Sequence, residues 1–272
     1  MGKSITILWM VVATIGIISS CTSTRKIKSP NGIAEIQYLD INRTKQYILI
    51  RGKNQSNPVL LFLHGGPGAS ATALLRKYNY DLENHFTMVY WDQRNAGKSY
   101  DKSFPKDEIK VAKYIEDVNV LVTYLKKRFG VEKVLLVGHS WGARLGLYAI
   151  QKYPEHFMGY VGVGQELAAF EGELLSYQYT LNRAKEVNHV KALKDLEESG
   201  PPQSGDYRTM YKNGFWGLVQ QKKWLLKLGG ERYKKTNYTD WIFSIWFSKE
   251  YSFADVIKYG KSSGFSAGNI IN

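Results

Sequence analysis

Ser140 is the residue whose type and setting most clearly predict chemistry. It lies in the pattern Gly-His-Ser-Trp-Gly at residues 138–142, directly after the apolar run at residues 134–137. A serine in a G-x-S-x-G pattern between a buried strand and a helix occupies a sharp, strained turn that exposes its hydroxyl. Small residues two before and two after the serine let the backbones of this turn approach closely. The pattern therefore predicts covalent catalysis with Ser140 as the nucleophile.

A second motif predicts donors for the transition state. Acyl transfer at Ser140 needs two hydrogen-bond donors aimed at the developing oxyanion, and the backbone N–H of Trp141 is placed to be one. The run His-Gly-Gly-Pro-Gly at residues 64–68 also follows an apolar stretch. Its glycines permit a tight approach, and Pro67 fixes the loop without removing the N–H of Gly66, the candidate for the second donor. The alternative, an ordinary glycine turn, is disfavoured because Ser140 lies downstream.

A third motif, residues 92–99, ends in Gly-Lys-Ser like a phosphate-binding loop. Such a loop requires glycine at its first position, where this sequence has Asp92, so phosphate binding is excluded. His64 and His139 lie beside the two loops described above. We interpret both as supports for those loops, not as the catalytic base.

The elements around these motifs alternate between strands and helices. An antiparallel hairpin is expected first, followed by buried strands that alternate with amphipathic helices. This order predicts an α/β fold with a mostly parallel, doubly wound sheet. After Gly164 only helical patterns and many aromatic residues follow, which predicts a helical lid. The expected strands are 33–40, 46–51, 59–63, 88–91, 134–137 and 160–163, and the expected helices are 111–129 and 141–153.

Together, the motifs at residues 64–68, 91–99 and 138–142 resemble those of α/β-hydrolases of the proline iminopeptidase type. The resemblance runs in order from about Ile33 to Val163. It implies an α/β-hydrolase fold, a Ser-His-Asp triad without metal or cofactor, and removal of N-terminal residues, typically proline, from short peptides or related amide or ester substrates. In that family the third motif is a structural turn below the active site. Asn95 stands where glycine is usual, and asparagine tolerates positive φ.

The acid and base of such a triad are hard to find. In this fold they follow the nucleophile in chain order, but no aspartate lies between Ser140 and the last histidine, His189. Glu166 and His189 are the weak candidates, and His156 lies too close to Ser140 in the sequence. We expect instead that the last strands of the sheet, which carry the acid and the base in the family, are missing. Strand 160–163 would then form an exposed apolar edge, and Ser140 would be a poor nucleophile.

Two classes of function follow from the incomplete triad. The first is a serine hydrolase that is impaired in this chain. The second is a non-catalytic, membrane-tethered binding protein or the product of a decayed gene.

The N-terminus predicts export and membrane attachment. Lys3 precedes the uncharged, mostly apolar residues 5–18, as in a secretory signal, and this stretch is too short to span a bilayer comfortably. Cys21, the single cysteine, follows two serines and resembles the cysteine that is lipid-modified in bacterial lipoproteins. The alternative is a signal peptide or uncleaved anchor in which the cysteine is incidental. Either way we expect a bacterial protein at the extracytoplasmic face of the cell membrane.

The charge is strongly positive, with 37 Lys and Arg against 24 Asp and Glu. The basic residues are scattered, so we expect a solvated lysine-rich surface and no nucleic-acid partner. On an exported protein this charge would lie against anionic lipid or wall polymer. The predicted division of the chain is a signal peptide at 1–20, a tether at 21–30, the α/β-hydrolase core at 31–165 and the helical lid at 166–272.

Overall fold

The computed structural model of the chain describes residues 23–165 and 168–270. The predicted signal segment, Cys21 and Glu166 lie outside these residues. Within the described part, no helix is both long enough and apolar enough to cross a membrane.

The N-terminal hairpin is confirmed. Strand β1 (Ile33–Ile41) pairs antiparallel with β2 (Thr44–Gly52), and Ile41 lies opposite Thr44 at the turn. Asn42 and Arg43 make the turn, with φ of 47° and 63°. Two successive residues in the left-handed region form the tight connection that matches the twist of paired strands.

Four further strands extend the hairpin into a six-stranded sheet of order β1-β2-β4-β3-β5-β6. Strands β4, β3, β5 and β6 run parallel to one another, and β2 pairs antiparallel with β4. The strands expected from the four apolar runs are therefore present, and β3 and β5, which precede the glycine-rich loop and the nucleophile turn, are neighbours in the sheet. The bounds are β3 (Val59–Leu63), β4 (Thr87–Asp92), β5 (Val134–His139) and β6 (Phe157–Val163).

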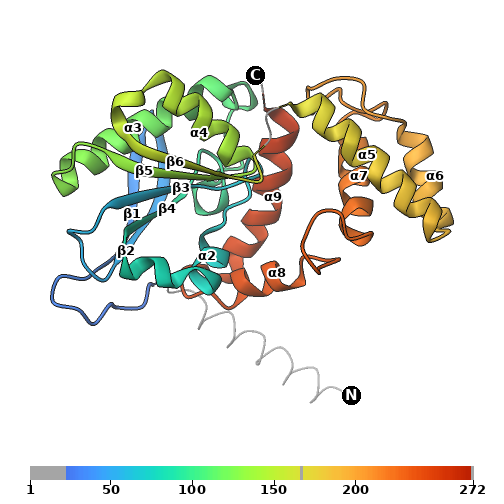
Figure 1. Cartoon of the computed structure of the whole chain (residues 1–272). Coiled ribbons are helices and arrows are strands. Elements are labelled where there is room, and N and C mark those ends of the chain that lie inside the picture. The colour runs from blue at the N-terminus through green and yellow to red at the C-terminus, as the bar shows by residue number, and fades with distance from the viewer. Residues whose placement is uncertain (1–22, 166–167, 271–272) are drawn as a thin grey trace, which may run out of the picture.

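Helices cover both faces of the sheet, which confirms the doubly wound arrangement (Figure 1). Helices α3 (Val111–Phe129) and α4 (Trp141–Lys152) lie on one face and bury their apolar sides against the strands. Helix α2 (Thr72–Tyr78) lies on the other face. It was not expected from the sequence, because seven residues show too little of a helical period.

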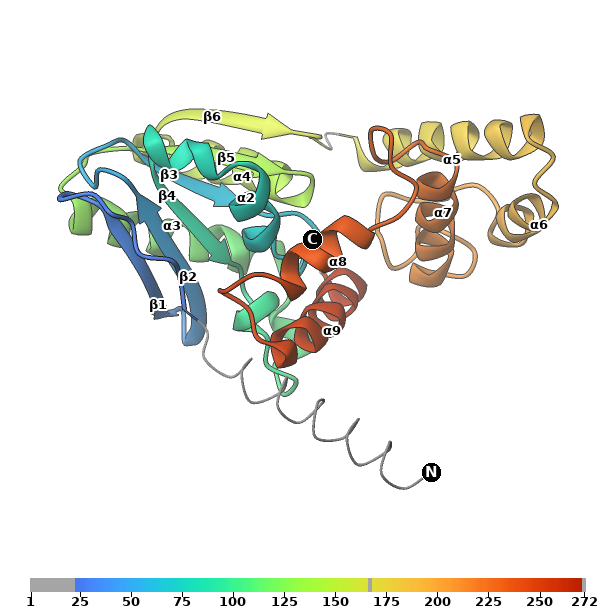
Figure 2. The same cartoon turned by 90° about the horizontal axis from the view of Figure 1, so that it is seen from below.

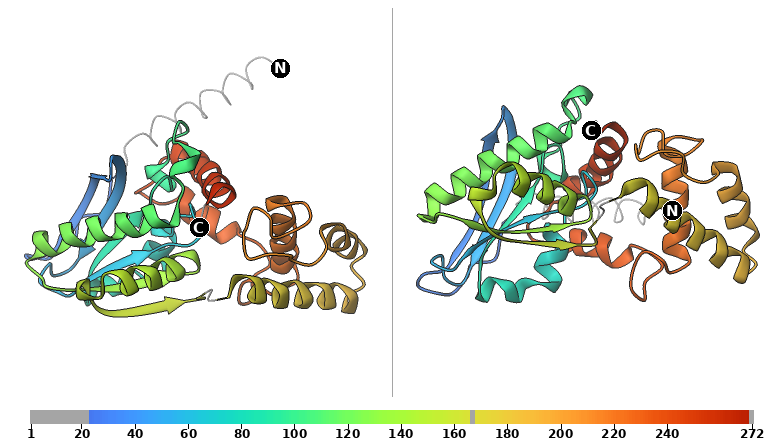
Figure 3. Two further views of the ribbon diagram at one scale, coloured as in Figure 1. Left: turned by 90° about the horizontal axis from the view of Figure 1, so that it is seen from above. Right: turned by 45° about the horizontal axis from the view of Figure 1, so that its top comes forward.

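Three helices after β6 form a separate cap beyond the carboxyl ends of the strands (Figures 2 and 3). They are α5 (Ala169–Glu186), α6 (Val190–Ser199) and α7 (Phe215–Lys227). Their apolar sides pack on one another around Tyr177, Leu196 and other buried residues. The predicted helical lid is therefore present, with a small core of its own.

The predicted extent of the lid, 166–272, is wrong for its last part. Helices α8 (Thr239–Trp246) and α9 (Phe253–Asn269) return to the sheet domain, and α9 lies between the cap and the strands (Figures 1 and 3). Ile245 and Tyr251 pack on Ala73 of α2, and Ile270 is buried in the main core. Helical spacing identifies an apolar side but does not say which partner covers it, so the sequence could not separate these helices from the cap.

Strand β6 forms one edge of the sheet, as expected. Among the described strands it pairs with β5 alone. Met158, Val161 and Val163 are 57%, 48% and 47% exposed. An apolar edge of this kind offers unpaired backbone groups to a further strand.

Candidate active site

Ser140 lies on a strained turn between β5 and α4. Its φ and ψ are 54° and −120°, a conformation that is costly for a residue with a side chain. Its backbone N–H donates to the carbonyl of Val163 over 2.9 Å, and its carbonyl accepts from the N–H of Ala143 over 2.9 Å. The side chain is half-buried. The turn therefore has the strained backbone expected of a nucleophile at this junction.

The two glycines of the motif are required by close backbone contacts. A Cβ on Gly142 would lie 2.1 Å from the carbonyl oxygen of Leu63 and 2.6 Å from that of His64. A Cβ on Gly138 would lie 2.3 Å from the carbonyl oxygen of Gly142. Helix α4 therefore starts directly against the end of β3, and this contact holds the nucleophile turn beside the loop at residues 64–68.

That glycine-rich loop lies against Ser140. A Cβ on Gly65 would be 3.2 Å from the Cβ of Ser140. Gly66 has a φ of 118°, which a residue with a side chain rarely adopts. Within the described residues, no acceptor takes a hydrogen bond from the backbone N–H of Gly66 or of Trp141. Both donors predicted for the oxyanion are therefore unpaired and belong to the two segments that meet at Ser140.

Gln93 connects these segments, and the sequence analysis did not single it out. Its backbone N–H donates to Nε2 of His64 over 3.1 Å, and its side-chain amide donates to the carbonyl of His64 over 2.9 Å. Its side-chain oxygen accepts from the indole of Trp141 over 3.2 Å. Gln93 follows directly after the buried strand β4, and a buried amide at such a place needs several partners. It fixes the glycine-rich loop and the nucleophile helix relative to each other.

His64 is fully buried, and burial lowers its pKa to about 4. Because Nε2 accepts from Gln93, the proton lies on Nδ1, which donates to the carbonyl of Gly65 over 2.8 Å. Burial also lowers the pKa of His139. The His139 ring lies next to Gly65 on one side and Gly164 on the other. Both imidazoles thus pack within the loops beside Ser140.

The third motif forms a turn held by buried polar groups. Asn95 has a φ of 51°, so it occupies the left-handed region where a glycine is usual in the resembled family. The carboxylate of Asp92 accepts from the backbone N–H of Lys98 over 2.8 Å. The Lys98 ammonium donates to Asp255 over 3.0 Å and to the carbonyl of Glu250 over 3.2 Å. Lys98 is thus held by α9 and its preceding loop, in agreement with the exclusion of a phosphate-binding loop.

Helix α9, which its helical spacing alone had placed in the predicted lid, packs against the glycine-rich loop and the turn of the third motif. The Ser262 hydroxyl donates to the carbonyl of Gly68 over 2.9 Å and accepts from the N–H of Gly97 over 3.3 Å. The Ser266 hydroxyl donates to the carbonyl of Asn95 over 3.3 Å. Two buried serines therefore join the glycine-rich loop to the turn of the third motif.

The structure does not bring His189 to Ser140. His189 lies at the start of α6, and α6 lies on the side of the cap away from the sheet (Figures 1 and 2). Its Nδ1 accepts from the N–H of Ala192 over 3.3 Å, and its ring packs on Trp224 with 4.7 Å between ring centroids. It therefore caps a helix and fills the core of the cap. The other weak candidate, Glu166, lies outside the described residues.

No histidine pairs with the nucleophile. All five histidines of the sequence are described, and none hydrogen-bonds to the Ser140 hydroxyl. His156 instead contacts Lys126 and Asn119, on α3. The described chain thus places a nucleophile and two oxyanion donors together without a general base.

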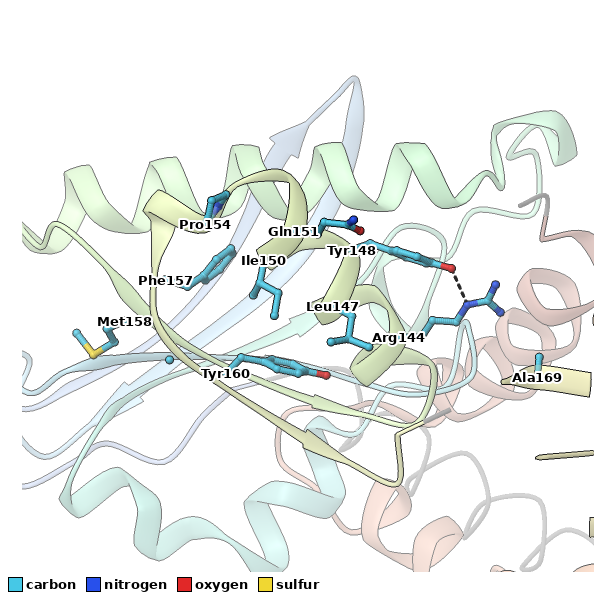
Figure 4. Close-up of a pocket in the computed structure, with 11 residues that line it drawn as sticks. Arg144, Leu147, Tyr148, Ile150, Gln151, Pro154, Phe157, Met158, Tyr160 and Ala169 are labelled. Atoms are coloured by element: carbon cyan, nitrogen blue, oxygen red, sulfur yellow. Dashed lines mark hydrogen bonds between the residues drawn. The ribbon is translucent and has the colours of Figure 1, made fainter. Parts of the chain in front are cut away.

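A groove of about 790 Å³ lies beside this site, between α4 and the edge strand β6 (Figure 4). Leu147, Phe157 and Tyr160 line it, and the Arg144 guanidinium donates to the Tyr148 hydroxyl over 3.1 Å at one end. Neither Ser140 nor the glycine-rich loop lines this groove. It is therefore a feature of the sheet edge and separate from the candidate active site.

Comparisons with known proteins agree with this geometry. Residues 58–199 match the α/β hydrolase fold family. A probable aminopeptidase of Bacillus subtilis is 32% identical over 83% of this chain and 74% of its own length. A proline iminopeptidase of Neisseria gonorrhoeae is 31% identical over 46% of this chain, and the match spans 38% of that protein. Among solved structures, a proline iminopeptidase-related protein of Thermus thermophilus has a TM-score of 0.47 at 20% identity, over 88% of each chain. The family match and the Bacillus subtilis relative show that the chain belongs to the α/β-hydrolase family and is aminopeptidase-like in sequence.

Proposed function

We propose that this member of the α/β-hydrolase family uses Ser140 as a nucleophile to hydrolyse the bond after the N-terminal residue of short peptides or similar amides and esters. The observation that carries this proposal is the strained Ser140 turn packed against the unpaired N–H groups of Gly66 and Trp141. The aminopeptidase-like relatives support a peptide substrate with a free N-terminus.

In the proposed reaction, Ser140 Oγ attacks the scissile carbonyl carbon and the carbonyl oxygen becomes an oxyanion. The N–H groups of Gly66 and Trp141 hydrogen-bond to this oxyanion and stabilise it. The proton of the hydroxyl must leave and the amine must be protonated as it departs, which yields an acyl-enzyme that water then hydrolyses. Both proton transfers normally pass through a histidine.

We propose that the described residues alone catalyse this reaction weakly, because no histidine hydrogen-bonds to the Ser140 hydroxyl. Without a base, a serine hydroxyl is a poor nucleophile. Oxyanion stabilisation and substrate binding then leave a rate of about 10³–10⁴-fold over the reaction in water. Efficient hydrolysis would need a general base, which no described residue supplies to Ser140.

The test is the hydrolysis of aminoacyl p-nitroanilides by the wild-type chain and by Ser140→Ala. We expect release of p-nitroaniline from substrates with a free amine, and loss of this release in the variant. N-acetylated substrates serve as the control, because an aminopeptidase requires the free N-terminus. Equal rates for the wild-type chain and Ser140→Ala would refute the role of Ser140.

A non-catalytic binding protein is the second candidate, favoured by the absence of a histidine partner for Ser140 in the described chain. It predicts that aminoacyl amides bind without turnover. Calorimetric titration of an aminoacyl amide into the wild-type chain and into Ser140→Ala would then give equal affinities, and neither chain would release the amine.

We also propose that the chain is exported and held at the extracytoplasmic face of a bacterial membrane, through a lipid on Cys21 or through the uncleaved N-terminal segment. Support comes from the sequence of residues 3–21, with a positive charge, an apolar stretch and Ser-Ser-Cys at its end. Metabolic labelling with an alkyne fatty acid tests the lipid. Labelling that is lost in Cys21→Ser supports it, and a mature N-terminus other than lipid-modified Cys21 would contradict it.

A further inference from the structure

We propose that one face of the molecule, built around helix α8, docks on the surface of an anionic phospholipid bilayer. This α8 face consists of three outward apolar side chains of α8 and its end, together with six exposed basic residues around them. The apolar members are Ile242, Phe243 and Phe247, and the basic members are Arg25, Lys26, Lys28, Lys53, Lys77 and Lys249. The proposal rests on the membrane tether proposed above and adds to it the surface that meets the lipid.

The apolar part of this face is not explained by packing within the described chain. Helix α8 turns Ile245 inward, where it packs on Ala73 and Tyr251. Its other side leaves Phe243 50% and Phe247 76% exposed, with their rings stacked at 5.9 Å between centroids. Adjacent exposed aromatic rings mark an interaction site, and aromatic side chains are favoured at the interface between lipid and water.

The basic part surrounds these rings. Phe243 and Phe247 line a groove of about 760 Å³ that also contains eight basic and three acidic side chains. Two of the acids, Glu83 and Glu250, are buried and paired with Arg51 and Arg76. The six exposed basic side chains of the α8 face form no ion pair with any described residue. The groove therefore carries an excess of uncompensated positive charge next to exposed aromatic rings.

The chain enters the described structure at this same face. The N–H of Ser23 donates to the carbonyl of Lys249 over 3.0 Å, and the Thr24 hydroxyl donates to Glu250 over 2.9 Å. The Arg51 guanidinium donates to the carbonyl of Arg25 over 2.6 Å. The first two bonds fix the start of the described chain to the loop that follows α8, and the third fixes it to β2.

This attachment limits the distance between the α8 face and the proposed anchor. A lipid on Cys21 would be two residues from Ser23, which span at most about 7 Å, and the apolar stretch ending at residue 18 is five residues away, at most about 18 Å. At physiological ionic strength a surface charge is felt over about 8 Å. The tether of at most about 7 Å, from a lipid on Cys21, is within this range and brings the basic residues nearest Ser23 into the field of acidic headgroups. Basic and aromatic side chains together, placed at a short tether, favour an anionic bilayer over a soluble anionic partner.

The test uses the full chain reconstituted into vesicles of phosphatidylcholine alone or with phosphatidylglycerol. A polarity-sensitive fluorophore is attached to Phe247→Cys, or in a second variant to Ile242→Cys, and its quenching by spin-labelled lipid is measured. Val190→Cys is the matched control, because Val190 is 78% exposed but lies on the cap. The wild-type chain treated in the same way gives the background from Cys21.

We expect quenching at position 247 to be about threefold or more above that at position 190 in vesicles with phosphatidylglycerol. Reversal of three charges, in Lys26→Glu, Lys28→Glu and Lys249→Glu together, should weaken this docking by at least about tenfold. Equal quenching at 247 and 190, or equal quenching with and without phosphatidylglycerol, would overturn the proposal.

Flotation of the chain with vesicles of phosphatidylcholine alone reports the tether separately. Flotation without quenching at 247 would refute the α8 face and keep the tether. Binding and quenching that require phosphatidylglycerol, with no flotation on phosphatidylcholine, would support the α8 face and refute the tether. Loss of quenching on addition of soluble teichoic-acid-like polyphosphate, with no dependence on lipid charge, would assign the face to a soluble polyanion and overturn the proposal.

Discussion

Replacement of Gly142 by alanine tests whether the nucleophile turn is built as described. The new Cβ would overlap the carbonyl oxygens of Leu63 and His64, at 2.1 and 2.6 Å. Overpacking of this kind costs about 1–3 kcal/mol, and the obstructing atoms belong to the backbone at the end of β3, which cannot rotate away. The higher helix propensity of alanine offsets about 0.5–1 kcal/mol. After this offset, we expect Gly142→Ala to lower the free energy of unfolding by about 0.5–2 kcal/mol.

Gly172→Ala is the matched control. Gly172 also lies in the first turns of a helix, α5, but a Cβ there would meet nothing within 4 Å. The same chemical change should therefore raise the free energy of unfolding by about 0.5–1 kcal/mol. Urea unfolding followed by circular dichroism measures both variants. A Gly142→Ala variant as stable as Gly172→Ala would refute the close contact between α4 and β3.

Three further predictions concern two buried side chains, His64 and Asp117, and the half-buried His189. Burial lowers the pKa of His64 to about 4, so the unfolded chain takes up this proton first and stability falls as the pH drops from about 6.5 towards 4. We expect the free energy of unfolding to fall by about 2–3 kcal/mol by pH 4.5, and this loss should be absent in His64→Gln. Identical pH profiles of stability for the two chains would contradict the buried neutral ring. Asp117→Asn should lower the free energy of unfolding in urea by about 3–5 kcal/mol, because it leaves the buried guanidinium of Arg94 without its bidentate partner. A loss below about 1 kcal/mol would show that water reaches this pair. His189→Ala should destabilise the cap by about 0.5–2 kcal/mol, because it removes a helix cap and the packing on Trp224. The reactivity of Ser140 towards a fluorophosphonate should not change. A large drop in that reactivity would show that His189 acts as the base.

The sheet and the nucleophile turn could be predicted because their signals are local. Buried parallel strands appear as short apolar runs, and the turn at Ser140 needs glycines at fixed positions on either side. The helix expected at 111–129 has these same bounds in the structure, since its apolar period begins at Val111 and Gly130 ends it with a φ of 63°. Each of these features depends on a few neighbouring residues.

The contacts made by Gln93, Ser262 and Ser266 could not be predicted in this way. Ser262 is 194 residues from Gly68, and no pattern within α9 says that its serines face the glycine-rich loop. Gln93 acts through three separate hydrogen bonds to two segments that the fold alone brings together. Such long-range polar contacts follow from tertiary packing. Tertiary packing also determines that α8 and α9 pack on the sheet domain and not within the cap.

The most direct test of the central claim is to react the chain with a fluorophosphonate and to locate the adduct by mass spectrometry. We predict one adduct per chain on the tryptic peptide 134–144, in which Ser140 is the one serine, and none in Ser140→Ala. Because no histidine hydrogen-bonds to the Ser140 hydroxyl, the rate should keep rising with pH through 9. An adduct on another serine, or no adduct at all, would contradict the nucleophile assignment. A rate that levels off near pH 7 would show that a histidine base acts on Ser140 after all.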